Sequence, residues 1–191
     1  MVIYTIFVLY NNNLSFMKKL LLVAFVFMCS YTTVKAQAFG IKAGLNFANF
    51  NGNDADDFNV LTSFHVGMVA EMHLMDALSV QPEFLYSVQG AKTKDETYKL
   101  NYVTLPVMLK LYFTDSFNIH AGPQIGLLIG ESDSFTTFES STYDLGFAGG
   151  VEFFFADNFA AQARYNAGST KVSDKYELKN SVLQLSLCYM F

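Results

Sequence analysis

The sequence predicts an all-β fold: an eight-stranded antiparallel up-and-down transmembrane β-barrel with short periplasmic turns and longer extracellular loops. Residues 181–191 alternate apolar and polar side chains and end the chain, so one face of this strand is wholly apolar. Seven further segments alternate in the same way, and the connections between them are alternately very short and long. In water, such a terminal strand would promote aggregation, whereas barrel closure in lipid pairs its edges and places its apolar face against acyl chains.

The first four expected strands are residues 39–47, 64–74, 78–88 and 102–113. The first alternates Phe, Ile and Leu with Gly, Lys and Asn, and the second alternates apolar residues with His, Gly and Glu. A three-residue turn leads to the third strand, where Pro82 removes a ladder donor and predicts a bulge. The fourth alternates Val and Leu with Thr, Pro, Lys and Tyr.

The last four expected strands are residues 117–129, 143–155, 159–167 and 181–191. Short turns precede the first and the third of these strands. Strands of this length suit a tilted crossing of a bilayer, which takes about 9–11 residues. Connections two, four and six have two or three residues, whereas connections one, three, five and seven have about ten or more. This alternation is typical of outer-membrane barrels, and an even strand count places both ends of the barrel on the periplasmic side.

The outward aromatic residues are expected to form two girdles, as at the two interfaces of a membrane. The periplasmic girdle is expected to contain Phe39, Phe113, Phe117, Phe155, Phe159, Tyr189 and Phe191. The opposite girdle is expected to contain Phe47, Phe64, Tyr86, Tyr143 and Tyr165.

The N-terminal region is expected to be removed. Residues 1–16 are interpreted as an upstream extension before a true start at Met17, and residues 17–36 as a signal peptide with Lys18 and Lys19 before an apolar run. The barrel is then residues 37–191. Removing three lysines leaves 9 basic against 17 acidic residues, a net charge of −8 that argues against nucleic acid as a partner. Of the two cysteines only Cys188 remains, so an intramolecular disulfide is excluded.

Several segments resemble the small porin-like outer-membrane β-barrel family that includes PorT. They are YVTLPVMLKLYF at 102–113, HAGPQIGLLIG at 120–130, DLGFAGGVEF at 144–153, ARYNAG at 163–168 and LCYMF at 187–191. The resemblance implies an eight-stranded barrel in the outer membrane, inserted by the barrel-assembly machinery, with Tyr189 and Phe191 as the assembly signal. The family is functionally mixed, so the resemblance does not name an activity.

Charged residues on the inward faces are the main candidate site. They are Lys42, Glu71, Glu83, Lys110, Glu152 and Arg164, three of each sign, and all lie in the lower half of the lumen. Eight strands enclose a lumen just wide enough for side chains to fill, and unpaired charges there would be costly. We therefore expect a structural plug of ion pairs, and a narrow gated ion path is the functional alternative.

No catalytic site, metal site or cofactor is expected. His65, His73 and Glu71 share the inward face of one strand, and His120 points inward from another, but a hydrogen-bonded luminal histidine is several times more common than a metal ligand. No serine, histidine and acid are grouped as a hydrolase requires. The acidic segment 51–57 lacks the spacing of a known Ca²⁺ loop.

The expected function is that of a small closed outer-membrane barrel with a structural or surface-binding role, not an enzyme. Residues 131–141, with Phe135 and Phe138, could contact an extracellular partner. Expected partners are outer-membrane lipid, the assembly machinery, and an extracellular or secretion-system protein. The alternatives are a narrow porin or ion channel, an accessory component of protein secretion like PorT, and a secreted lipocalin-like carrier, which would need an apolar interior.

Overall fold

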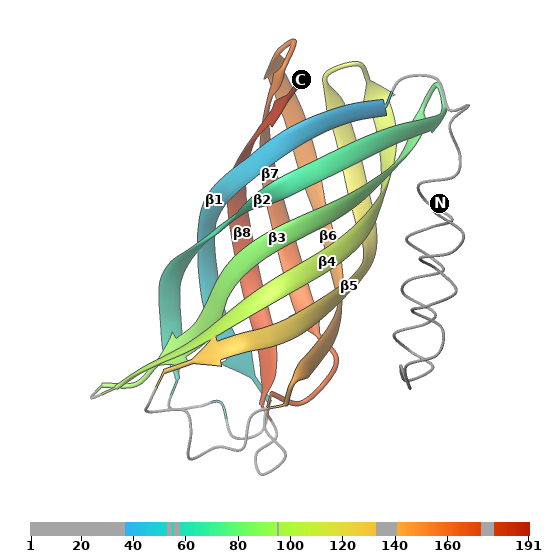
Figure 1. Ribbon diagram of the computed structural model, residues 1–191. Coiled ribbons are helices and arrows are strands. Elements are labelled where there is room, and N and C mark those ends of the chain that lie inside the picture. The colour runs from blue at the N-terminus through green and yellow to red at the C-terminus, as the bar shows by residue number, and fades with distance from the viewer. Residues whose placement is uncertain (1–36, 53–54, 56–57, 95, 133–140, 173–177) are drawn as a thin grey trace, which may run out of the picture. The chain divides into compact units, whose positions relative to one another are not determined.

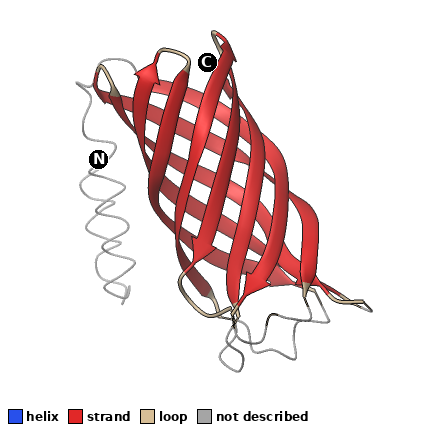
Figure 2. Ribbon diagram, turned by 180° about the vertical axis from the view of Figure 1, so that it is seen from behind, coloured by secondary structure: helices blue, strands red, loops and turns tan. Residues whose placement is uncertain are grey.

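The computed structural model describes residues 37–191, except residues 53, 54, 56, 57, 95, 133–140 and 173–177. The expected upstream extension and signal peptide therefore lie outside the described residues. Eight antiparallel strands form a closed barrel in chain order, and β1 pairs with β8 (Figures 1 and 2). The strands are β1 (Gln37–Asn51), β2 (Asn59–Met75), β3 (Leu78–Lys92), β4 (Thr97–Thr114), β5 (Phe117–Glu131), β6 (Tyr143–Ala156), β7 (Phe159–Gly168) and β8 (Lys179–Met190). The described residues include no helix with the length and apolar character needed to cross a membrane.

The two ends of the barrel differ, as the spacing of the segments predicts. Three tight turns join β2 to β3, β4 to β5 and β6 to β7, and both ends of the barrel segment lie at this turn end. The other four connections lie at the opposite end, which we call the loop end. The expected strands and their inward and outward faces are therefore confirmed.

The strands extend further toward the loop end than the sequence predicts. The third connection was expected to be a long loop, yet β3 continues to Lys92 and β4 begins at Thr97. Only residues 93–96 connect them, and the backbone N–H of Thr93 donates to the carbonyl of Glu96 at 2.9 Å. The first connection, residues 52–58, is also shorter than expected. In the added part of this hairpin Lys99 faces outward, whereas Gln89 is buried and inward Ala91 and Leu100 are fully buried.

The prediction of a bulge at Pro82 is wrong. The pairing of β2 with β3 keeps one register on both sides of it, with Glu83 opposite Val69 and Val80 opposite Met72. Proline therefore removes one donor without inserting a residue into the ladder.

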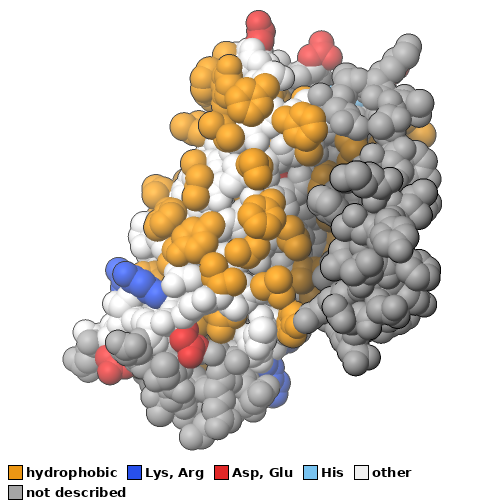
Figure 3. Space-filling view, viewed as in Figure 1, with side chains coloured by type: hydrophobic (Ala, Val, Ile, Leu, Met, Phe, Trp, Pro, Cys, Tyr) orange, Lys and Arg blue, Asp and Glu red, His pale blue; other side chains and the backbone are white. Residues whose placement is uncertain are grey.

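The outer face of the barrel is apolar and exposed (Figure 3). Girdle aromatics contact one another between neighbouring strands: the ring centroids of Phe159 and Tyr189 are 4.8 Å apart, and those of Phe64 and Tyr86 are 5.9 Å apart. Phe84 and Phe147 also point outward between the two girdles, and they are 51% and 57% exposed. A face with this much exposed apolar area needs an apolar solvent, which a bilayer provides.

Inside the loop end, apolar side chains form a cluster that the sequence interpretation missed. We call it the mouth cluster: Phe50, Ala91, Tyr98, Leu100, Tyr102, Val172 and Leu178. Connecting residues fold onto it, since the ring of Phe58 lies edge-on to Phe50 at 5.1 Å and to Tyr98 at 5.7 Å. The mouth cluster fills the interior where the strands extend beyond their expected ends.

Candidate functional site

The inward charges lie in a buried layer near the turn end and form two trios. In the first trio, the Arg164 guanidinium donates to both carboxylate oxygens of Glu83, at 2.8 and 2.6 Å, and Lys42 Nζ lies 3.2 Å from the same carboxylate. This trio carries a net charge of +1, and its side chains are essentially inaccessible to solvent. A bidentate contact of this kind is the strongest form of arginine–carboxylate pairing.

The second trio carries the opposite net charge. Lys110 Nζ lies 2.7 Å from Glu71 and 2.5 Å from Glu152, and all three side chains are buried. The Glu71 carboxylate also accepts from the hydroxyl of Tyr112. Asn118 donates its amide to Glu152 at 2.9 Å. The two trios balance to zero net charge.

Two glutamines join the trios, and sequence reasoning did not single them out. Gln81 accepts from Lys110 at 3.0 Å and donates to Glu83 at 2.7 Å. Gln162 accepts from Lys42 and donates to Glu152 at 2.9 Å. The sequence predicts only that both glutamines face inward, because side chains alternate along a strand, and many luminal residues share this feature. They link the six charges into one network, so each buried charge has partners.

A neutral polar layer lies above the charged one. His65 contacts the Asn46 side-chain oxygen through Nδ1 and the Ser186 hydroxyl through Nε2, both at 2.8 Å. Asn46 also donates to Ser87 at 3.0 Å and accepts from Gln184 at 2.9 Å. This histidine is a hydrogen-bonded luminal residue, held by polar side chains of β1 and β8 rather than by acidic residues.

The other two histidines occupy different surroundings. His120 Nε2 accepts from Arg164 Nε at 3.2 Å, so it extends the first trio. His73 lies at the turn end with its side chain 43% exposed, 3.6 Å from Glu71 and stacked on Tyr112. Across the described residues, no group of three or more His, Cys, Asp or Glu side chains is arranged to hold a metal ion.

A third group of polar residues lies beneath the mouth cluster. Asn180 donates to the Asp144 carboxylate at 2.8 Å and to the Tyr102 hydroxyl at 3.3 Å. Thr170 donates to the other Asp144 oxygen at 3.0 Å. From the turn end to the loop end, the interior therefore passes from the charged layer through polar groups that include the Asp144 carboxylate to the apolar mouth cluster. Such an interior can brace the barrel and its loops, and the six charges of its charged layer are paired with one another.

The expected assembly signal lies at the turn end. Phe191 is 71% exposed, its N–H donates to the carbonyl of Phe39 at 2.7 Å, and its ring contacts that of Tyr189 edge-on at 5.4 Å. Asn158 of the last tight turn donates to the carbonyl of Met190 at 2.6 Å. The aromatic end is therefore held in place and accessible. The expected contact residues Phe135 and Phe138 lie outside the described residues.

Comparison with known proteins relates the chain to outer-membrane barrels. Residues 20–191 match the model of a family described as "Outer membrane protein beta-barrel domain". No curated protein matches the sequence. The structure is similar to that of neisserial surface protein A, with a TM-score of 0.56 and 14% identity over 82% of this chain and 100% of that one. It is also similar to Ail, the attachment invasion locus protein of Yersinia pestis, with a TM-score of 0.52 and 13% identity over 81% and 98% of the two chains.

Proposed function

The chain belongs to the outer membrane protein beta-barrel domain family, and from this premise we propose that it is a closed, non-enzymatic platform for a binding surface at its extracellular loops. It is a small β-barrel of the outer membrane, so the turn end is periplasmic and the loop end extracellular. Its partner is an extracellular molecule or a component of a secretion system.

The observation that carries the proposal is the mouth cluster. Loop residues Phe58 and Val172 pack onto inward residues of β1 and β4, so the barrel interior anchors the loops rather than leaving a pore beneath them. The N–H of Val172 donates to the carbonyl of Leu178 at 2.7 Å, which ties that loop to the start of β8. Binding surfaces are commonly built on loops that a rigid scaffold positions.

A second argument comes from the charged layer. A catalytic carboxylate or histidine needs to reach a substrate, but these groups are buried and paired with one another. The name of Ail, an attachment invasion locus protein of similar fold, supports a surface role by analogy of fold alone. A secreted lipocalin-like carrier does not fit, because the charges face inward and the apolar side chains face outward.

The test uses the whole barrel with altered loops. Residues 133–140 are replaced by a Gly/Ser linker of equal length, and the purified protein and the variant are applied to glycan and extracellular-matrix arrays. We expect binding by the native barrel and its loss in the variant. Heat-modifiable gel migration, the control for folding, should be the same for both proteins. Absence of binding across the arrays would argue against the platform, and binding that survives the replacement would exclude residues 133–140 as its contact segment.

A further inference from the structure

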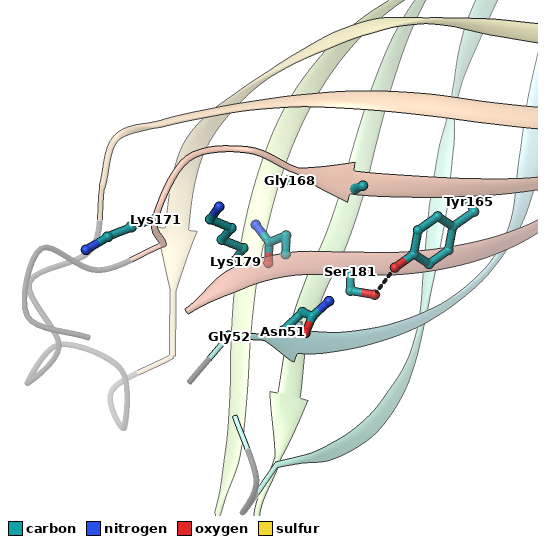
Figure 4. A pocket seen from close by; sticks show the side chains of 9 residues that line it. Asn51, Gly52, Tyr165, Gly168, Lys171, Lys179 and Ser181 are labelled. Atoms are coloured by element: carbon teal, nitrogen blue, oxygen red, sulfur yellow. Dashed lines mark hydrogen bonds between the residues drawn. The ribbon is translucent and has the colours of Figure 1, made fainter. Parts of the chain in front are cut away.

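A small cavity lies inside the barrel, next to the polar residues beneath the mouth cluster. It has a volume of about 10 Å³, which is about the space that one water-sized particle needs. We call it the Asp144 cavity; the lining residues used below are Asp144, Gly146, Asn166, Gly168 and Asn180. Figure 4 shows Gly168 at the end of β7, beside the first residues of β8.

Two paired glycines leave room for this cavity. Gly146 of β6 stands opposite Gly168 of β7 in the strand register, so neither position adds a side chain to the interior. A Cβ atom at Gly168 would lie 3.2 Å from Asp144 Oδ1 and 3.0 Å from the backbone nitrogen of Asn180. Because Gly168 has no Cβ atom, the Asp144 carboxylate and Asn180 can both come close to the backbone of β7 at the wall of the cavity.

The charge of Asp144 has no counterpart among the described buried residues. Of the buried carboxylates that the structure describes, Asp144 is the one that forms no ion pair. Its oxygens accept from neutral donors, the amide of Asn180 at 2.8 Å and the hydroxyl of Thr170 at 3.0 Å. The two trios already balance each other, so an ionised Asp144 adds one uncompensated negative charge to the interior. Such a charge is very costly unless a counter-ion or a proton neutralises it.

The amide groups at the same cavity are not fully satisfied. Asp144, Asn166 and Asn180 are only 8%, 6% and 3% exposed. Within the described part of the chain, neither side-chain polar atom of Asn166 has a hydrogen-bond partner, and Asn180 Oδ1 has none either. Buried polar atoms are almost always satisfied, so unpartnered amide atoms beside an unpaired carboxylate point to a bound particle that contacts them.

From the unpaired carboxylate and the unpartnered amides we infer that the Asp144 cavity binds one sodium ion. Hard cations take carboxylate, amide and carbonyl oxygens as ligands, and Asp144, Asn166 and Asn180 offer the first two kinds. One carboxylate balances one positive charge, whereas a divalent ion would leave an excess of positive charge. Magnesium also keeps several of its waters, for which a cavity of this volume has no room.

The ion fixes the point at which both ends of the β7–β8 connection meet the barrel interior. Thr170, two residues after β7, donates to Asp144 and accepts from the backbone N–H of Leu145 at 3.0 Å. Asn180, the second residue of β8, donates to the other oxygen of the same carboxylate. An ion on Asp144 therefore stabilises the folded barrel from inside. The site does not depend on the loop-binding role proposed above.

The test measures unfolding of the full barrel in detergent micelles as sodium is varied. Sodium chloride replaces choline chloride at constant total salt, because the choline cation is too large for the cavity. Heat-modifiable migration in urea gives the equilibrium constant of unfolding. An ion that binds only the folded state should lower this constant about tenfold for each tenfold rise in sodium above the dissociation constant.

Three variants locate the effect. Asp144→Asn keeps the shape of the side chain and removes its charge, so the sodium dependence should be lost. Asp157→Asn, exposed in the turn at the other end of β6, is the matched control and should keep the full dependence. Asn166→Leu removes one amide ligand and should raise the sodium concentration at which the dependence begins by about tenfold or more.

Three results would overturn the inference. Equal unfolding constants in sodium chloride and choline chloride would show that a water molecule, or a proton on Asp144, serves the cavity instead. A sodium dependence that survives Asp144→Asn would place the ion elsewhere. If Asp144→Asn does not fold, Asn166→Leu decides, and an unchanged onset of the sodium dependence in that variant would exclude the cavity as the site.

Discussion

At the scale of single residues, Glu83 is the centre of the charged layer. It is the only described carboxylate that pairs with both Lys42 and Arg164, and all three side chains are buried. Removing one partner from such a group leaves a buried charge without compensation, which costs far more than the pair itself contributes.

Glu83→Gln should therefore lower the free energy of unfolding by about 3–5 kcal/mol. Urea-driven unfolding in detergent micelles, followed by tyrosine fluorescence and heat-modifiable migration, measures this loss. The double variant Glu83→Gln, Arg164→Met should recover part of it, because one of the two uncompensated cations is removed. Asp76→Asn, in an exposed periplasmic turn, is the control and should change the free energy by less than about 0.5 kcal/mol. A loss at Glu83 no larger than that at Asp76 would contradict the assignment.

The sequence indicates which charged residues face inward, because successive side chains of a strand point to opposite faces. It does not indicate which of them meet, because that depends on how strands on opposite sides of the closed barrel are staggered. Arg164 of β7 reaches Glu83 of β3 across the lumen, a contact that no local pattern contains. Gln81 and Gln162 were missed for the same reason, since a neutral amide stands out only when its two charged neighbours are known.

At the scale of elements, the end of β8 separates assembly from stability. Phe191 is exposed and adds only an edge contact to Tyr189 and one backbone hydrogen bond. Deleting Phe191 should impair insertion in cells, seen as loss of heat-modifiable protein from the outer-membrane fraction, while refolding in detergent survives. Phe113→Ala removes another exposed periplasmic aromatic, from the middle of the chain, and should leave insertion intact. Equal losses in cells and in detergent would mean that Phe191 acts through stability.

The extended β3–β4 hairpin depends on one glycine. Gly90 has a φ of 124°, and a Cβ there would lie 2.0 Å from the carbonyl oxygen of Tyr98. Gly90→Ala should therefore disrupt the pairing beyond residue 90, at a cost of about 1–3 kcal/mol. Hydrogen exchange should show lost protection at Tyr98 and Leu100, while the lower part of β4 stays protected. Gly130→Ala, where the added Cβ meets only the side chain of Asn101, is the matched control.

This hairpin also shows where sequence patterns stop being informative. Residues 89–101 are rich in Lys, Asp, Glu and Thr, a composition that favours a loop. Residues 89–92 and 97–101 nevertheless form strand because pairing of β3 with β4 continues to Lys92 opposite Thr97, and because inward Leu100 packs in the mouth cluster. The membrane-spanning parts were predictable because lipid imposes an apolar outer face. No such constraint acts on the extracellular ends.

At the scale of the whole molecule, two different layers close the lumen. The charged layer lies near the periplasmic end and the mouth cluster near the extracellular end. We expect the native barrel to show no steady conductance in planar-bilayer recordings. Opening only the charged layer, by Arg164→Ala with Glu83→Ala, should not create a steady pore, because the mouth cluster remains. Steady conductance in the native barrel that disappears in Arg164→Ala would instead assign the charged layer to an ion path.

The partners of the buried charges also determine when their contacts can form. Lys42–Glu83 joins β1 to β3, Arg164–Glu83 joins β7 to β3, and Lys110 of β4 contacts Glu71 of β2 and Glu152 of β6. Three of these pairs span a single intervening strand, but β7 and β3 lie on opposite sides of the closed barrel, so an open sheet that has not yet curled cannot make the Arg164–Glu83 contact. We expect this contact to form late, after the strands have closed on themselves, and contacts made after the transition state slow unfolding without speeding folding. The Arg164–Glu83 pair is therefore expected to act on the lifetime of the inserted barrel.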